Sequence, residues 1–372
     1  MSDTTVVLVA DPHIGADKFG ASPDEWDAPL KEAADWAGDN QADAFIVAGD
    51  LFHRRNPTTE EYARATRILE PLIASGIDVL VVAGNHDLKA TRDSEPASWP
   101  WNTAVGEAAF RVVGYHDRKV SVLCLPWPRP VDYLTPRIGE GIAEELARTR
   151  DAVLERLRSP YRPAGPRILV GHAMVSYGTH MPQGPGLLLG KDVVLPFEEL
   201  RAICPQIFLG HVHDPRQQGY IGSTQPTDWG EADQQKGFQV YRASLIQSVE
   251  RIAYKTSLRL FSADENTEFP FLDDYMYDAG RIIIHGKEGV RLPTHAEALD
   301  LIAPHCRRVL DVQVIPYQPE RRRADVAAAS KEARPDLSDI PQAVRAWTGA
   351  RALSPDATAA VMARLEVLSR AP

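Results

Sequence analysis

Polar residues that could bind metal or carry protons follow five apolar segments of this sequence. One cluster, Gly84-Asn85-His86-Asp87, comes directly after the apolar run 79–83. Taken alone, it would be interpreted as an ordinary Asn/Asp turn. Because four other apolar runs end in the same way, we interpret the five clusters as parts of one site. The clusters are Asp11-Pro12-His13, Gly49-Asp50, Gly84-Asn85-His86-Asp87, Gly171-His172 and Gly210-His211-Val212-His213.

The candidate metal ligands offer oxygen and nitrogen donors and no thiolate, which suits Mn²⁺, Fe or Zn²⁺ better than copper or a structural zinc. They are too many for one ion and fit two ions if one carboxylate bridges; Asp50, after a central strand, is the best candidate. Two ions about 3.5 to 4 Å apart activate a water and stabilise a phosphate under in-line attack. The pattern therefore predicts phosphoester hydrolysis without a covalent enzyme intermediate. The candidate ligands are Asp11, His13, Asp50, Asn85, His172, His211 and His213.

His86 differs from these ligands because its neighbour Asn85 would already occupy the metal. A histidine beside a dinuclear centre can protonate a leaving oxygen or hydrogen-bond the phosphate in the transition state. Asp87 either orients His86 or simply forms the turn, and the sequence leaves both readings open. His53, three residues after Asp50, is a second candidate for phosphate contact. The other histidines lack such a context, and we expect them to be structural or exposed; they include His116, His180, His285, His295 and His305.

The surrounding elements must bring these clusters to one edge of a sheet. The first 83 residues have the order β-α-β-α-β, and their continuously apolar strands favour a sheet covered by helices on both faces. Ligands bind such sheets beyond the carboxyl ends of the strands, which is where the clusters fall. We predict strands at 5–10, 44–48, 78–83, 110–115, 120–125, 167–170 and 207–209, and helices at 24–38, from the capping box at 58–61 to Gly76, and at 138–158.

The C-terminal third predicts smaller elements. Strands at 237–242, 247–254 and 257–261 should form a terminal meander. A β-α-β unit follows, with strands at 281–285 and 309–315 and a helix at 294–303. Residues 321–339 have the composition of a linker. Two short helices after residue 340 could form a hairpin or dock on a partner.

Composition is that of a soluble globular protein, with 44% hydrophobic and 25% charged residues. We find no pattern of a signal peptide or membrane span. The cysteines Cys124, Cys204 and Cys306 match neither a disulfide framework nor a zinc motif, so we expect them in the core of a cytoplasmic protein.

The net charge of −10 is unevenly distributed. From residue 280 to the end, 14 Lys and Arg face 11 Asp and Glu, so the acidic excess lies in the first 279 residues. Part of that excess is carboxylate whose charge bound metal would offset. Net charge therefore does not exclude DNA as a substrate. The cluster Arg321-Arg322-Arg323 either forms a solvated loop or contacts nucleic acid directly.

Together, the five motifs resemble those of the calcineurin-like metallophosphoesterases. Within that superfamily, the segment from Gly49-Asp50-Leu51-Phe52-His53 through Arg54-Arg55-Asn56-Pro57 is similar to the SbcD-type nucleases, the bacterial form of the meiotic recombination nuclease subunit. The resemblance implies a four-layer α-β-β-α sandwich with a small α+β capping domain and C-terminal helices. We expect a phosphoesterase domain at 1–262, a capping domain that helps bind DNA at 263–318, a linker at 319–339 and C-terminal helices at 340–372.

The resemblance also implies roles for single residues. One Mn²⁺ would be held by Asp11, His13, Asp50 and His213, and the other by Asp50, Asn85, His172 and His211. His86 would be the catalytic acid or transition-state stabiliser. His53 would contact the phosphate, with Arg54 beside it as a substrate-binding candidate. The C-terminal helices would lead toward an SbcC-like ABC-type ATPase with a coiled coil, and the nuclease subunits would form a homodimer.

We therefore hypothesise a Mn²⁺-dependent DNA exonuclease and endonuclease in double-strand-break repair. One alternative is a small-substrate metallophosphoesterase, such as a cyclic-nucleotide phosphodiesterase or phosphoprotein phosphatase, which would not need the segment after Gly280. Another is a non-catalytic assembly subunit on the same fold, which would be expected to have lost ligands, whereas this sequence retains the full set.

Overall fold

The computed structural model describes residues 4–88, 101–104, 106–114, 119–135, 137–158, 166–182, 192–244, 246–264, 266–267, 277–285, 287 and 290–315. The predicted linker at 319–339, the C-terminal helices and the cluster at 321–323 lie outside these residues. The chain divides into two compact units, one of Met1–Ile284 with Pro293–Gln313 and one of His285–Leu292 with Val314–Pro372. The site described below belongs wholly to the first unit.

The first sheet has six strands in the order β12-β11-β1-β2-β3-β4. Its four strands β1 to β4 run parallel, and β11 and β12 extend it as an antiparallel pair beside β1. The strands are β1 (Thr4–Val9), β2 (Ala44–Ala48), β3 (Asp78–Val82), β4 (Asn102–Ala104), β11 (Gly237–Ala243) and β12 (Ser248–Ala253).

The second sheet has four strands in the order β10-β7-β6-β5. Strands β10, β7 and β6 run parallel, whereas β5 is antiparallel to β6. The strands are β5 (Ala109–Val113), β6 (Val120–Leu125), β7 (Arg167–His172) and β10 (Ile207–Gly210). Every strand of both sheets except the short β4 corresponds to a segment predicted from apolar patterning.

The two sheets pack face to face, and alternating side chains of each strand separate the layers. On β1, Val6 and Leu8 point into a core shared with the second sheet, which includes Val122. The side chains of Val7 and Val9 point the other way, into a core with the helices. The prediction of one sheet covered by helices on both faces is therefore wrong. A strand buried on both faces is apolar throughout whether its cover is a helix or another sheet.

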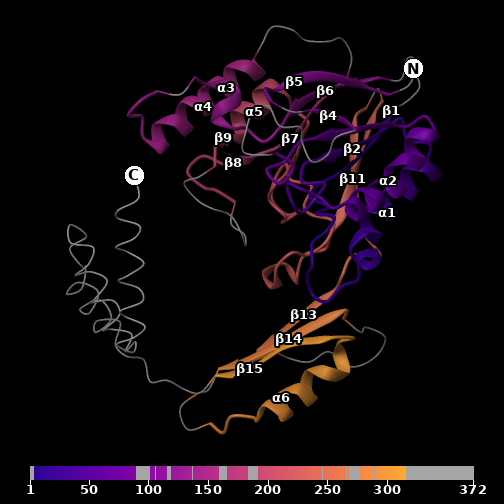
Figure 1. Ribbon diagram of the computed structural model, residues 1–372, viewed down its shortest axis with the longest axis vertical. Coiled ribbons are helices and arrows are strands. Elements are labelled where there is room, and N and C mark those ends of the chain that lie inside the picture. Colours follow the sequence, from indigo (N-terminus) through magenta and orange to yellow (C-terminus); the bar gives the residue numbers. More distant parts are fainter. Residues whose placement is uncertain are drawn as a thin grey trace. The chain divides into compact units, whose positions relative to one another are not determined.

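Helices cover only the outer face of each sheet, which confirms the implied α-β-β-α sandwich. Helices α1 (Pro23–Asp39) and α2 (Thr59–Ala74) pack on the first sheet, and α4 (Ile142–Leu157) and α5 (Phe197–Ile203) pack on the second (Figure 1). The shorter elements are α3 (Pro130–Tyr133), β8 (Met174–Ser176), β9 (Val194–Pro196) and the 3-10 helices η1 (Trp229–Glu231) and η2 (Ala303–His305).

Local signals determine where the long helices begin. Helix α2 starts with the predicted capping box, in which the Thr58 hydroxyl accepts from the Glu61 N–H and the Glu61 carboxylate accepts from the Thr58 N–H. Helix α4 begins at Ile142, later than the predicted start at 138. Gly139 has a φ of +81°, which is incompatible with a continuous α-helix, and Gly141 is the N-cap. Among the described residues, no helix is long and apolar enough to cross a membrane.

A three-stranded sheet in the order β13-β14-β15 follows the sandwich. It contains β13 (Leu260–Asp264), β14 (Ala279–His285) and β15 (Val309–Ile315), with α6 (His295–Ile302) between the last two in sequence. The prediction of a third meander strand at 257–261 is wrong, because β13 pairs in parallel with β14 and not with β12. Apolar patterning identifies a strand but does not select its partner. The boundary at residue 262 stays a prediction.

Replacing Leu8 by alanine should lower the free energy of unfolding by about 2–5 kcal/mol, because this fully buried side chain fills the space between the sheets. Urea unfolding followed by circular dichroism measures the change. Val249→Ala, on the exposed edge strand β12, is the matched control and should change stability by less than about 0.5 kcal/mol. Equal losses for both variants would contradict the face-to-face packing of the two sheets.

Candidate metal centre

The carboxyl ends of five strands meet at one place and bring all seven predicted ligands together. The first sheet contributes residues that follow β1, β2 and β3, and the second contributes residues that end β7 or follow β10. Contacts between ligands of the two sheets, given below, show that neither sheet forms the site alone. The candidate ligands are Asp11 and His13 after β1, Asp50 after β2, Asn85 after β3, His172 on β7, and His211 and His213 after β10.

One group of ligands forms around His13. Its Nε2 lies 3.3 Å from the Nε2 of His213 and 3.8 Å from Oδ2 of Asp50. A ligand atom of Asp11 lies within 4.8 Å of ligand atoms of both histidines. Two imidazole nitrogens that face each other beside carboxylates form a suitable site for one divalent cation.

A second group forms around Asn85. Its Oδ1 lies 3.0 Å from Nε2 of His172 and 3.2 Å from Nδ1 of His211. The Nε2 of His172 is also 3.5 Å from Oδ2 of Asp50, the same oxygen that approaches His13. Asp50 therefore lies between the two groups, in the position that the predicted bridging carboxylate requires.

Buried charge gives the strongest indication that the residues fit a cation. Asp11, Asp50 and Asp87 are each at most 2% exposed. Burial and the neighbouring charge of Asp50 raise the pKa of Asp11 well above its usual range and that of Asp87 to about 8. Burial lowers the pKa of His172 to about 4, so this ring is neutral and able to ligate. Without a cation, several carboxylates in such a low dielectric repel one another.

Hydrogen bonds orient two of the histidines. The Nδ1–H of His172 donates to the carbonyl oxygen of Ala48 at 3.0 Å. The Nδ1 of His213 lies 2.8 Å from Oγ1 of Thr227 and 3.4 Å from Oε1 of Glu231. Each contact leaves the Nε2 lone pair directed at the ligand groups, which is how outer hydrogen bonds tune metal-binding histidines.

Behind His213 lies a buried ion pair that the sequence analysis missed. The Nζ of Lys236 lies 2.6 Å from Oε2 of Glu231 and 2.9 Å from the carbonyl oxygen of His213, and both charged side chains are 1% exposed. Burial alone would raise the pKa of Glu231, but the contacts with His213 and Lys236 lower it to about 2. Both residues lie in a charged, irregular segment, so no pattern distinguished them from surface residues.

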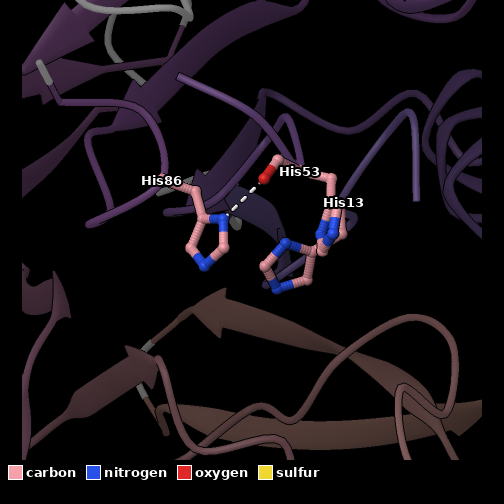
Figure 2. Close-up of side chains that lie close together, drawn as sticks. All are labelled: His13, His53 and His86. Carbon is pink, nitrogen blue, oxygen red and sulfur yellow. Dashed lines mark hydrogen bonds between the residues drawn. The ribbon is translucent and has the colours of Figure 1, made fainter. Parts of the chain in front are cut away.

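His86 and His53 face the same space as His13 (Figure 2). The Nδ1–H of His86 donates to the carbonyl oxygen of His53 at 2.6 Å, which leaves the Nε2 of His86 4.0 Å from Oδ2 of Asp50. The rings of His53 and His86 stack with centroids 5.5 Å apart. Burial, and then the nearby His86, lower the pKa of His53. These three histidines also have ligand atoms within 4.8 Å of one another.

Asp87 connects the turns after β2 and β3. Its Oδ2 accepts the backbone N–H groups of Asp50 and Gly84, each at 2.8 Å. The contact that holds the His86 ring comes instead from the carbonyl of His53. Asp87 therefore positions the backbone that carries Asp50 and His86, which differs from a direct orienting contact with the His86 ring.

Arg54 contacts residues outside the cavity wall. Its Nη2 donates to the carbonyl oxygen of Gly15 at 3.3 Å, and its Nε lies 3.8 Å from Glu61. Arg54 is not among the described residues that line the cavity beside the candidate ligands. The structure therefore brings His53 to the site but not Arg54.

Several ligands have an unusual backbone conformation. Asp11, His13, Asp50 and His211 all have φ in the left-handed region, between +49° and +92°. Such conformations cost non-glycine residues about 1–3 kcal/mol and persist where surrounding contacts impose them. The approach is so close at Gly84 that a Cβ there would lie 2.1 Å from Oδ1 of Asp50. A side chain at position 84 would collide with Asp50, so glycine is required there.

An open cavity of about 260 Å³ gives access to the ligands. Its wall contains predicted site residues together with Lys18, Thr227 and Asp228, which the sequence analysis did not single out. The described wall consists of His13, Lys18, Asp50, His53, Asn85, His86, His211, His213, Thr227 and Asp228. The arrangement could bind one or two divalent ions and an anionic substrate beside them.

Residues 4–215 match the family model of the calcineurin-like phosphoesterases, which is more than half of the chain. The chain belongs to this family. It is 26% identical over 270 residues to the SbcD subunit of the Escherichia coli K12 nuclease SbcCD, covering 66% of this chain and 67% of that protein. It is 25% identical over 239 residues to the SbcD subunit of Bacillus subtilis, covering 57% of each. It is 33% identical over 87 residues to the DNA double-strand break repair protein Mre11 of Archaeoglobus fulgidus, covering 23% of this chain and 19% of that protein.

Removing divalent metal should lower the melting temperature of this phosphoesterase, because the buried carboxylates then lose their counter-charge. A metal that binds only the folded state at 100 times its Kd adds about 2.7 kcal/mol. Differential scanning calorimetry with EDTA, and then with excess Mn²⁺, measures the effect and its reversal. An unchanged melting temperature under both conditions would argue against a metal centre.

Glu231→Gln should weaken Mn²⁺ binding about tenfold, because the neutral side chain no longer fixes the Nδ1 side of His213 or pairs with Lys236. Isothermal titration calorimetry on the metal-free protein gives the Kd directly. Glu60→Gln, an exposed position on α2, is the matched control and should bind Mn²⁺ as the wild type does. Identical Kd values for both variants would mean that the buried pair has no role in ligation.

Proposed function

We propose that this protein is a Mn²⁺-dependent DNA nuclease, both exonuclease and endonuclease, that hydrolyses phosphodiester bonds during double-strand-break repair. One observation carries the proposed chemistry, namely the convergence of seven oxygen and nitrogen ligands from two sheets beside an open cavity. The names of the relatives, a nuclease subunit and a double-strand break repair protein, support DNA as the substrate.

Two ions would divide the ligands as the family resemblance implies, with Asp11, His13, Asp50 and His213 around one and Asp50, Asn85, His172 and His211 around the other. Such ions supply charge that lowers the pKa of water and neutralises a phosphate under attack. The location of Asp50 Oδ2 between His13 and His172 supports its bridging role.

His86 acts on the substrate in this proposal. Its Nδ1–H is held by the His53 carbonyl, so the Nε2 faces the cavity and can hydrogen-bond the phosphate or protonate the leaving oxygen. The ring of His53 stacks on it and lines the same cavity, where it can contact a phosphate oxygen.

The proposed setting is a complex. Relatives are named as subunits of SbcCD, which supports an SbcC-like ABC-type ATPase with a coiled coil as the partner, and we propose a homodimer of the nuclease subunit. The segment at 263–318 would form the capping domain that helps bind DNA. The residues after 318 would reach the ATPase. A cytoplasmic location remains a prediction.

Labelled linear DNA incubated with Mn²⁺ tests the proposal. The wild type should cleave it, and His86→Ala should lower kcat by about 10²-fold or more, because the proton donor is lost. His180→Ala, an exposed histidine outside the described cavity wall, is the matched control and should retain the wild-type rate. Calorimetry verifies that both variants still bind Mn²⁺.

A different result would favour a small-substrate phosphoesterase. That result is no cleavage of DNA, with or without a partner ATPase, alongside fast turnover of a cyclic nucleotide or a phosphoprotein. Wild-type cleavage by the His86→Ala variant would instead remove His86 from the chemistry.

A further inference from the structure

Lys18 is the one lysine among the described residues that line the cavity. It belongs neither to the candidate metal ligands nor to the proposed catalytic histidines. Lys18 is exposed and belongs to the loop between β1 and α1. Its charge is close enough to His53 to contribute to the lowered pKa of that ring. No ion pair to Lys18 occurs among the residues that the structure describes. Among the described residues of the cavity wall, Lys18 is therefore a cation available to an anionic substrate.

The loop that carries Lys18 has a strained backbone. The next residue, Phe19, has a φ of +54°, and Gly20 follows with a φ of +61°. Glycine adopts this region freely, but for a bulky side chain it is an outlier. Strain of this kind persists only where neighbouring contacts hold it, and it concentrates at binding sites.

An aromatic contact holds Phe19. Its ring packs edge to face against Trp229, with centroids 5.0 Å apart and planes at 75°. Trp229 begins η1, directly after Thr227 and Asp228, which line the same cavity. The guanidinium of Arg281 on β14 lies 5.2 Å from the Trp229 ring centroid, and its Nε donates to the Ser262 hydroxyl at 2.8 Å.

A second arginine holds the other end of the loop. The Nη1 of Arg308 donates to the carbonyl oxygen of Gly20 at 2.7 Å and lies 3.1 Å from Oε2 of Glu25 on α1. Arg308, in the segment before β15, thus contacts the loop directly, and Arg281 on β14 contacts it through Trp229. These contacts fix the backbone on the C-terminal side of Lys18, whose side chain lines the cavity.

We propose that Lys18 binds a phosphate of the DNA strand next to the scissile one, and that the Phe19–Trp229–Arg281 stack positions it. The scissile phosphate would already be engaged by metal, His86 and His53, so an additional cation serves a neighbouring phosphate. A lysine suits this role, because its ammonium is a compact charge on a flexible stem. The ligand class is an extended phosphodiester strand. The inference rests on the proposed nuclease function and specifies how the strand is held.

The experiment compares two substrates with full-length protein and Mn²⁺: a single-stranded oligonucleotide and bis(4-nitrophenyl) phosphate, which has one phosphate. Lys18→Ala should lower the ratio of their kcat/KM values about fivefold, the effect of one exposed ion pair. The slope of log KM for the oligonucleotide against log salt concentration should fall by about 0.7, as expected for one lost phosphate contact on a single strand. Lys31→Ala, an exposed lysine on α1 that pairs with Asp35, is the matched control and should leave both quantities at wild-type values.

Trp229→Ala tests the positioning part and should lower the same ratio. If that variant does not fold by circular dichroism, Arg281→Ala replaces it, because Arg281 is partly exposed. A wild-type ratio in the folded variant would overturn the positioning role of the stack.

Three results separate this inference from the proposed function. An unchanged ratio and salt slope in Lys18→Ala, with a wild type that cleaves DNA, overturns the inference alone. Equal losses on both substrates mean that Lys18 contacts the scissile phosphate, which also overturns it. A wild type that hydrolyses bis(4-nitrophenyl) phosphate but not DNA overturns the nuclease function itself.

Discussion

Three buried carboxylates connect the strand ends on which the rest of the structure depends. Asp11 accepts the His211 N–H and so joins the first sheet to the second, whereas Asp50 accepts the His86 N–H and Asp87 accepts the Asp50 N–H. Each hydrogen bond offsets part of the free-energy cost of burying a carboxylate, but the backbone N–H donors carry no full positive charge. The same three carboxylates that hold the turns together therefore favour the binding of cations.

This preference explains why the site lies between two sheets. A carboxylate cluster stays buried only on a scaffold that does not yield, and strands β1, β2, β7 and β10 are apolar on both faces and packed on both. The sheets bring His13 to His213 and Asn85 to His172 across the layer boundary. Binding sites built on strand ends in this way keep their geometry when surface loops vary.

The candidate ligands and the loop that carries Lys18 are held by different parts of the fold. The candidate ligands lie at rigid strand ends, and the buried pair Glu231 and Lys236 lies behind His213. In the proposal for Lys18, contact with a DNA strand depends on the cavity wall. Lys18 belongs to a loop that Arg308 contacts directly and that Arg281 contacts only through Trp229. A change in the three-stranded sheet could therefore alter which substrates bind while the ligand set stays intact.

The sequence by itself determined the strands, the capped helices and the seven candidate ligands that lie together at the strand ends, because apolar period, capping boxes and motif glycines are local signals. It did not determine what covers each strand, so a second sheet took the place of predicted helices and β13 paired with β14. Nor could it identify Lys18, Glu231 or Lys236, whose roles come from neighbours far away in the chain or from burial of charge. Asp87 is an example. The motif identified the residue, but only the tertiary structure showed that its carboxylate accepts the backbone N–H of Asp50. Local patterns specify which residues fall at strand ends, whereas burial and long-range contacts decide what those residues do.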